Sequence, residues 1–124
     1  MRDNIGILIV DDQCLFSESL KTVFETYVED IVVKGLAASG HEALDLIAHL
    51  QPEIVLMDIR MPGMDGVETT KLIKERFPGT KVLILTTFDD DEYVFDALRQ
   101  GAEGYLLKDV PPIELISAIR AVYP

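Results

Sequence analysis

Five short apolar runs, separated by amphipathic segments, restrict the fold of this chain more than any other feature of its sequence. The runs are rich in Ile, Val and Leu, and they cover residues 5–10, 31–38, 53–58, 81–87 and 103–108. Most of them lack an alternation of polar and apolar side chains, which is typical of parallel strands covered on both faces. Connections this short favour right-handed crossovers. The chain is therefore predicted to form five strand–helix units in an α/β fold, a doubly wound three-layer sandwich.

The segments between the runs carry the period of an α-helix. The first helical segment places five hydrophobic residues on one predicted face: Phe16, Leu20, Val23, Phe24 and Tyr27. The last helical segment has a similar stripe, made of Ile113, Ile116, Ile119 and Val122. Three residue pairs fit capping boxes that open helices, namely Ser39 with Glu42, Asp65 with Glu68 and Asp89 with Glu92. We interpret the acidic run 89–92 as a favourable interaction with the helix dipole.

Length and composition indicate one domain, residues 1–124, and exclude several classes of protein. No apolar run approaches the ~20 residues of a membrane span, and the N-terminal run lacks the cleavage site of a signal peptide. The net charge of −11 would repel a phosphate backbone, so the chain alone is not expected to bind nucleic acid. Cys14, the one cysteine, cannot form an internal disulfide, which predicts a cytoplasmic location. We interpret Cys14 as a small buried hydrophobic residue rather than a redox sensor.

The run 53–58 ends on a charge, Asp58, directly after four apolar residues. Burying an unpaired carboxylate costs several kcal/mol, so Asp58 needs either solvent or partners. Other runs end in a similar way: the first at Asp11 and Asp12, the fourth at Thr86 and the fifth at Lys108. The carboxyl ends of the strands form the edge at which open α/β sheets bind ligands. If the first and third strands are neighbours, three carboxylates converge at this edge.

Three carboxylates together need a counter-charge, and a hard divalent cation such as Mg²⁺ supplies it. Lys108 can pair with an anion at Asp58, and Thr86 can donate its hydroxyl hydrogen to the same place. These are the components of phosphoryl transfer, with Asp58 as the candidate acceptor. Taken singly, the aspartates are ordinary caps, Thr86 is a strand former and Lys108 is a solvated strand end. Matching chemistry from four strands at one edge favours a functional site.

Four motifs carry a resemblance to the receiver domain of two-component response regulators. They are VDD (10–12), LMDIRMPGMDG (56–66), LTT (85–87) and GYLLKD (104–109), and their order and spacing together are highly specific. The resemblance covers the whole chain and implies a flavodoxin-like (βα)₅ parallel sheet with strand order 2-1-3-4-5. The stretch 86–109 further resembles the branch whose output is a LuxR-type helix-turn-helix DNA-binding domain.

The resemblance implies a role for each residue of the acidic edge. Asp58 would accept a phosphoryl group from a phosphohistidine on a sensor histidine kinase. Asp12 and Asp58 would bind Mg²⁺ together with the main-chain carbonyl of Arg60, and Asp11 would act through a water. The protein would catalyse only its own phosphorylation and dephosphorylation, and would not be an enzyme for a separate substrate.

The resemblance also implies a switch. Thr86 would bond the phosphoryl oxygen, Lys108 would pair with it, and Tyr105 would turn inward when Thr86 moves. Arg60 and Phe88 would tune the rate of dephosphorylation. We expect the phosphorylated chain to form a homodimer and to act on promoter DNA only through an output domain. That domain is expected to lie outside this chain, which stops just after the last predicted helix, although a stand-alone receiver is the alternative.

Two departures from the family pattern and two rival functions remain. Asp109 follows the lysine where many receivers have a proline, so no cis peptide bond is expected there. Pro112 suits the first position of the last helix, but Pro111 cannot provide a side-chain cap. One rival is an aspartate-nucleophile phosphatase. Such enzymes carry a motif like DxDx[TV] after the first strand, whereas this chain has DDQCL. The other, a flavodoxin-like binding module, needs a hydroxyl- and glycine-rich phosphate loop that DDQCLF does not supply.

Overall fold

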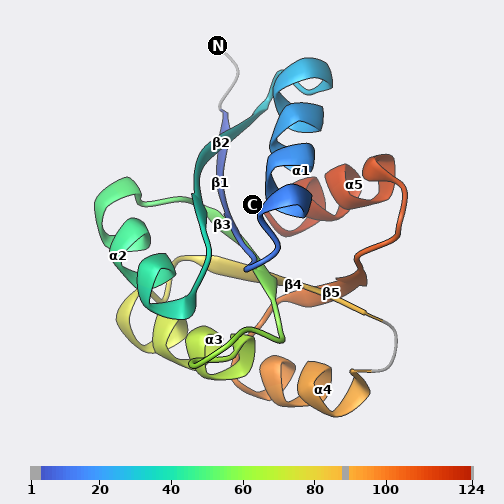
Figure 1. Ribbon diagram of the computed structural model, residues 1–124. Helices are drawn as coiled ribbons and strands as arrows, with labels where there is room; N and C mark the ends of the chain where they lie inside the picture. Colours follow the sequence, from blue (N-terminus) through green and yellow to red (C-terminus); the bar gives the residue numbers. More distant parts are fainter. Residues whose placement is uncertain (1–3, 88–89, 124) are drawn as a thin grey trace.

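The computed structural model describes residues 4–87 and 90–123, and its centre is a parallel sheet of five strands (Figure 1). The strand order is β2-β1-β3-β4-β5, which confirms the predicted α/β doubly wound sheet. The strands are β1 (Ile5–Val10), β2 (Ile31–Ala37), β3 (Ile54–Asp58), β4 (Lys81–Thr86) and β5 (Gly104–Leu107). The observed ends differ from the predicted ones by one residue at most. The sequence therefore located every strand of this sheet.

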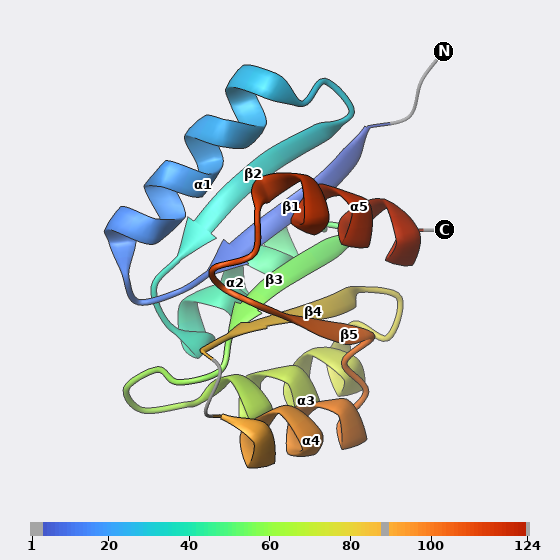
Figure 2. The same ribbon diagram turned by 90° about the vertical axis from the view of Figure 1, so that its right-hand side faces the viewer.

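Five helices cover the two faces of the sheet. They are α1 (Cys14–Tyr27), α2 (Gly40–Leu50), α3 (Gly66–Arg76), α4 (Asp91–Arg99) and α5 (Pro112–Val122). Helices α1 and α5 lie on one face, and α2, α3 and α4 lie on the other (Figures 1 and 2). None of the described helices is long and apolar enough to cross a bilayer.

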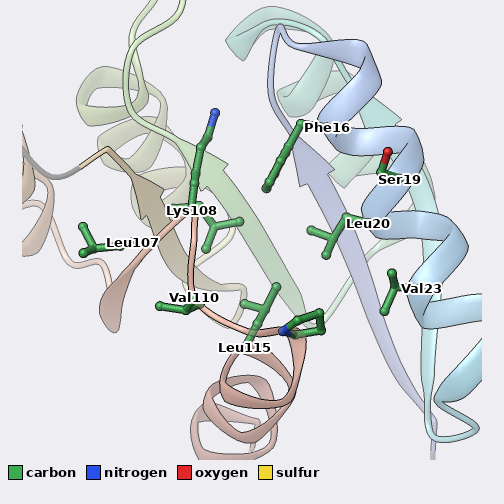
Figure 3. A pocket seen from close by; sticks show the side chains of 10 residues that line it. Phe16, Ser19, Leu20, Val23, Leu107, Lys108, Val110 and Leu115 are labelled. Carbon is green, nitrogen blue, oxygen red and sulfur yellow. The ribbon is translucent and has the colours of Figure 1, made fainter.

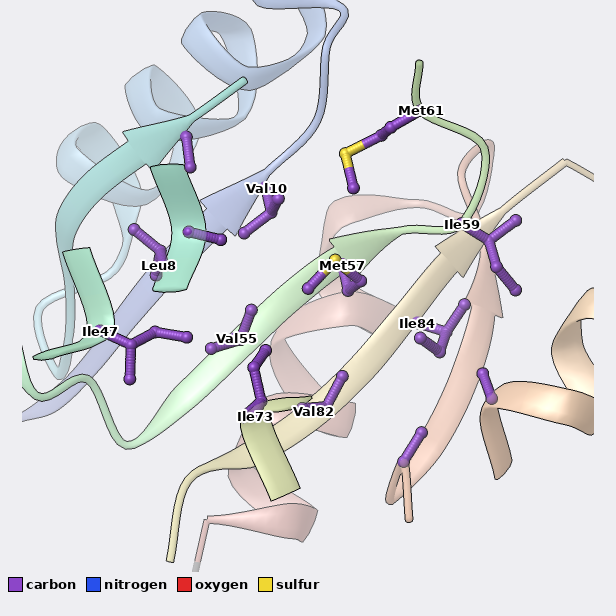
Figure 4. Close-up of a cluster of buried hydrophobic side chains, with 14 of the residues drawn as sticks. Leu8, Val10, Ile47, Val55, Met57, Ile59, Met61, Ile73, Val82 and Ile84 are labelled. Atoms are coloured by element: carbon purple, nitrogen blue, oxygen red, sulfur yellow. The ribbon is translucent and has the colours of Figure 1, made fainter. Parts of the chain in front are cut away.

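The side-chain alternation of β3 shows how one strand feeds both hydrophobic layers. Ile54 and Leu56 belong to the cluster under α1 and α5, whereas Val55 and Met57 belong to the cluster under α2, α3 and α4 (Figure 4). All four side chains are fully buried. Because successive residues of a strand point to opposite faces, a strand covered twice must be apolar at every position. The run that ends at Asp58 is therefore the centre of the fold.

Two of the three predicted capping boxes have their cap bond. Ser39 accepts a hydrogen bond from the Glu42 amide at 3.1 Å, and Asp65 accepts one from the Glu68 amide at 2.9 Å. Asp89 of the third pair lies outside the described residues. The N-cap of α4 is Asp90, and its side chain makes no capping bond. At the start of α5, Pro112 is the first helical residue and Pro111 is an N-cap without a side-chain bond, as the sequence predicted.

Three residues predicted to be buried are exposed. Tyr27 is 80% exposed, because α1 ends there and the next residue, Val28, fills the buried position. Ile113 is 71% exposed, because it lies about 200° around α5 from the buried Leu115. Cys14 is exposed as the first residue of α1, so its interpretation as a buried hydrophobic residue was wrong.

Candidate phosphoryl-transfer site

Strand register brings the polar strand ends to one edge of the sheet. Met57 of β3 pairs with Val10 of β1, so the residues that follow them, Asp58 and Asp11, leave the sheet side by side. In the same way Thr86 of β4 pairs with Leu107 of β5, and Lys108 follows. The amide of Lys108 also donates to the carbonyl of Thr86 at 2.9 Å. The backbone alone thus gathers these groups at the carboxyl end of the sheet.

The three predicted carboxylates come together. One oxygen from each of Asp11, Asp12 and Asp58 lies within 4.8 Å of the others. Asp11 and Asp58 are buried, at 2% and 7% exposure, whereas Asp12 is open to solvent. Because Asp12 is exposed, a ligand can reach this cluster from solvent, while the two buried carboxylates stay close together. We call these three residues the acidic centre.

Lys108 supplies the positive charge of the acidic centre. Its Nζ lies 2.7 Å from Asp11 Oδ2 and 3.5 Å from Asp58 Oδ1, and it donates a hydrogen bond to Gln13 Oε1 at 3.0 Å. The Asp11 contact is a charge pair, because that oxygen has no hydrogen-bond partner of good geometry among the described residues. Figure 3 shows the Lys108 side chain extended beside the Phe16 ring, with its nitrogen away from Val110 and Leu115. Lys108 and Phe16 help to line a hollow of about 170 Å³. Its apolar walls orient the hydrocarbon stem of the lysine.

One lysine does not balance three carboxylates. Burial, and then the charge of Asp11, raise the pKa of Asp58 from 3.8 to about 7. Lys108 lowers the pKa of Asp58, and Asp12 raises it further. Ionised Asp58 therefore needs more positive charge than the chain provides. The donor set of hard carboxylate oxygens fits Mg²⁺, which takes one or two carboxylates and fills its other positions with water or phosphate oxygens.

Two glycines after β3 shape the chain that follows Asp58. The Gly66 amide donates to the Ile59 carbonyl at 2.8 Å, and a Cβ at Gly66 would lie 2.4 Å from the Asp58 carbonyl oxygen. Gly63 has φ +76°, a conformation that glycine adopts without strain. Gly66 is therefore needed for the close approach of α3 to the strand end, and Gly63 for the turn that precedes α3. The role of the Arg60 carbonyl as a metal ligand stays a prediction.

A second cluster of polar side chains, built around one carboxylate and missed by the sequence analysis, lies beside the acidic centre. Asp90 is 3% exposed, and its Oδ2 accepts hydrogen bonds from Thr86 Oγ1 at 3.2 Å and from Thr87 Oγ1 at 2.9 Å. Its Oδ1 pairs with the guanidinium of Arg60. We call these four residues the Asp90 cluster. The available signal was the length of the acidic run 89–92, since a helix needs only one N-cap.

The switch residues lie where strands β4 and β5 end. Thr86 is buried and Tyr105 is 52% exposed, so the tyrosine points outward. Thr86, Leu107 and Lys108 help to line a hollow of about 200 Å³ at these strand ends. All peptide bonds between described residues are trans, including that from Lys108 to Asp109. Phe88, predicted to flank the site, lies outside the described residues.

Comparison with known proteins adds to this geometry. Residues 7–120 match the family described as the response regulator receiver domain. The transcriptional regulatory protein YxjL of Bacillus subtilis is 46% identical over 97% of this chain and 55% of its own length. The oxygen regulatory protein NreC of Staphylococcus carnosus is 43% identical over 94% of this chain and 54% of its own. The chain thus spans about half the length of these relatives. A two-component response regulator of the LuxR family from Aurantimonas has a TM-score of 0.89 at 31% identity, covering 98% of this chain and 86% of that one.

Proposed function

This chain belongs to the response regulator receiver domain family, and we propose that it is a switch operated by phosphorylation of Asp58. The phosphoryl donor is a phosphohistidine of a sensor histidine kinase. One observation carries the proposal: the acidic centre gathers three carboxylates within 4.8 Å and offers them one lysine. The negative charge of these carboxylates exceeds the positive charge of the lysine. The site is therefore suited to bind a cation, and a phosphoryl group attached to that cation.

The proposed reaction is a transfer from nitrogen to oxygen. A carboxylate oxygen of Asp58 attacks the phosphorus, and a new O–P bond forms as the P–N bond to the donor imidazole breaks. The electron pair of the broken bond stays on the imidazole nitrogen, which takes a proton from solvent. The signal ends by hydrolysis: a water oxygen attacks the phosphorus and loses a proton to solvent, while the O–P bond to Asp58 breaks and its electron pair stays on the Asp58 carboxylate, releasing inorganic phosphate. Positioning and charge neutralisation provide most of the acceleration in such transfers.

Each residue of the site has a separate task in this proposal. Asp12, Asp58 and the Arg60 carbonyl hold Mg²⁺, with Asp11 acting through a water. When bound, Mg²⁺ neutralises charge on the phosphoryl oxygens and on Asp58. Lys108, already placed between two carboxylates, pairs with the phosphoryl group. The half-buried Phe16 ring, which lies against the Lys108 ammonium, helps to keep that ammonium directed toward this edge of the sheet.

Intact-mass measurement tests the acceptor directly. With Mg²⁺ and acetyl phosphate, the chain should gain one phosphoryl group, and Asp58→Asn should remove the gain because an amide cannot form the acyl phosphate. Asp45→Asn is a matched control, because Asp45 is an exposed aspartate on α2. Equal labelling of Asp58→Asn and wild type would disprove the assignment of Asp58.

The proposed output is a change at the α4–β5–α5 side of the molecule. Thr86 bonds the phosphoryl group, the loop after β4 follows it, and Tyr105 turns from solvent toward the space near Thr86. This change favours a homodimer, and in a longer chain it would control a DNA-binding output domain of the kind that LuxR-family relatives carry. The cytoplasm is the proposed site of action, which the single free cysteine supports.

Sedimentation velocity tests the output. The unmodified chain should sediment as a monomer, and the chain treated with beryllofluoride and Mg²⁺ should sediment as a dimer, since beryllofluoride stands in for the phosphoryl group. Asp58→Asn treated in the same way is the control and should remain monomeric. Identical monomeric profiles of the wild type with and without beryllofluoride would contradict self-association of this chain.

A further inference from the structure

Asp90 holds the hydroxyl group that the proposed switch requires. Its Oδ2 accepts from Thr86 Oγ1 at 3.2 Å, in a place where both residues are at most 3% exposed. Within the residues that the structure describes, Thr86 Oγ1 has one other acceptor, the Thr87 carbonyl at 3.1 Å, and makes no hydrogen bond to Asp58. In the unmodified chain the hydroxyl is therefore turned toward the start of α4.

The position of Asp90 makes this contact unusual. An aspartate at a helix N-cap ordinarily accepts a hydrogen bond from the second or third helical amide, as Asp65 does at the start of α3. Asp90 is the N-cap of α4 and makes no such bond. Its two oxygens are used by Thr86, Thr87 and Arg60 instead. The carboxylate thus connects the end of β4 and the loop after β3 to the first turn of α4.

Thr86 cannot keep its present acceptors and bond a phosphoryl group at once. A threonine hydroxyl has one hydrogen to donate, which the Asp90 carboxylate and the Thr87 carbonyl share in the unmodified chain, so a bond to a phosphoryl oxygen at Asp58 requires release of both acceptors. Hydrogen bonds to a charged carboxylate are stronger than those between neutral groups. Of the two acceptors that the phosphoryl group must displace, the Asp90 carboxylate is therefore the stronger competitor.

We propose that Asp90 is a positioning residue that competes with the phosphoryl group for the Thr86 hydroxyl and so keeps the unmodified chain in its inactive form. The inference rests on the proposed function of Asp58. Only the molecules in which Thr86 has left Asp90 can form the hydrogen bond from Thr86 to the phosphoryl group. The apparent affinity of the site for a phosphoryl group is lowered accordingly. Thr87 weakens this competition, because its hydroxyl shares the same oxygen of Asp90.

The affinity for beryllofluoride in the presence of Mg²⁺ tests the proposal. Asp90→Asn keeps the shape of the side chain but replaces the charged acceptor, so beryllofluoride should bind about 3- to 10-fold more tightly than to wild type. Asp91→Asn is the matched control, because Asp91 is the adjacent acid in the first turn of α4 and is exposed, and it should bind as wild type does. Thr87→Val, at an exposed position, should weaken binding about 2-fold because Asp90 Oδ2 then serves Thr86 alone.

A role through Thr86 is separated from a merely structural role by a second background. In Thr86→Val, which has no hydroxyl, adding Asp90→Asn should leave the beryllofluoride affinity unchanged. The side-chain rotamer of Thr86, followed by NMR scalar couplings in the unmodified chain, should shift in Asp90→Asn and stay fixed in Asp91→Asn.

Three results would overturn the proposal. Equal beryllofluoride affinity of wild type, Asp90→Asn and Thr87→Val would refute the role of Asp90 and leave the proposed function of Asp58 standing. The same tightening by Asp90→Asn with and without the Thr86 hydroxyl would show that Asp90 acts by another route. A wild-type chain that binds no beryllofluoride at all would contradict the proposed function, and the role of Asp90 with it.

Discussion

Two buried aspartates lie at the same edge of the sheet, and their surroundings are opposite. Asp90 is 3% exposed, and it has a guanidinium and two hydroxyl groups for its two oxygens. Asp58 is 7% exposed, and it shares one ammonium with Asp11, which lies closer to that ammonium. Asp11 and Asp12 each place a carboxylate oxygen within 4.8 Å of one on Asp58. The same side chain is thus neutralised in one place and left with excess charge in the other.

The difference explains which aspartate is suited to react. A buried carboxylate whose partners are present has little to gain from a new ligand, and it serves to hold neighbouring groups. A buried carboxylate that lacks positive charge has a raised pKa and gains free energy from a cation or from covalent transfer to an electrophile.

The largest effect should come from the open side of the acidic centre. Asp12→Ala removes a carboxylate that we expect to bind Mg²⁺ directly, so the Kd for Mg²⁺ should rise about 10- to 100-fold. Asp91→Ala removes an exposed acid near the Asp90 cluster and should leave the Kd as in wild type. Mg²⁺ titrations followed by NMR measure the Kd of both variants. An equal rise of the Kd in both would mean that Mg²⁺ binding depends on net charge alone.

Removing the neutralised aspartate should destabilise the fold. Asp90→Ala leaves two hydroxyl groups and a guanidinium without their common acceptor, which should lower the free energy of unfolding by about 1–3 kcal/mol. The low end of this range is favoured because the Arg60 side chain is 61% exposed and can hydrate its charge. Urea denaturation measures the loss, and a stability equal to that of Asp91→Ala would show that the cluster contributes nothing.

Removing the other aspartate should have the opposite sign. Without Mg²⁺ at pH 8, Asp58→Asn should raise the free energy of unfolding by about 1–2 kcal/mol, because it eliminates a buried charge with too little compensation. Between pH 4 and 7 the folded state keeps a proton on Asp58 that the unfolded state has released, since the pKa is about 7 in the fold. The wild type should therefore lose stability, relative to Asp58→Asn, as the pH rises through this window. A stability difference that is independent of pH would show that Asp58 has an ordinary pKa.

The smallest effect concerns the lysine. Lys108 lowers the pKa of Asp58, so Lys108→Ala should raise that pKa further in the metal-free chain. The ¹³C shift of the Asp58 carboxyl carbon, followed against pH, reports the change. Lys34→Ala is the control, because the Lys34 ammonium contacts the Leu50 carbonyl at the opposite end of the sheet. A lower pKa of Asp58 in Lys108→Ala would reverse the inferred sign of the interaction.

Most of the fold could be predicted because its signals are local. In the run 53–58, the four residues 54–57 that precede Asp58 are all apolar, and only a strand covered on both faces requires this. The cap residues Ser39 and Asp65 precede their helices by one residue, which placed two helix starts correctly. Tyr27 was misplaced because a helical stripe does not show where the helix ends. Ile113 was misplaced because a spacing of three residues drifts around the helix, so the first residue of the stripe lies about 200° from the buried Leu115.

The acidic centre was also predictable, and the Asp90 cluster was not. Asp11, Asp12 and Asp58 follow strands, so the common edge of a parallel sheet brings them together without any knowledge of side-chain contacts. The partnership of Asp90 with Arg60 joins residues 30 positions apart across two loops. It depends on the paths of those loops, and no period or motif in the sequence encodes them.

The exposed thiol of Cys14 offers a practical access to this site. Its sulfur is 4.0 Å from the carbonyl oxygen of Asp12, and the sequence contains no other cysteine. A maleimide fluorophore would therefore attach at one position without any prior mutation, next to the solvent-facing side of the acidic centre. The native chain thus carries its own labelling handle, from which arrival of Mg²⁺ or of beryllofluoride can be followed in real time.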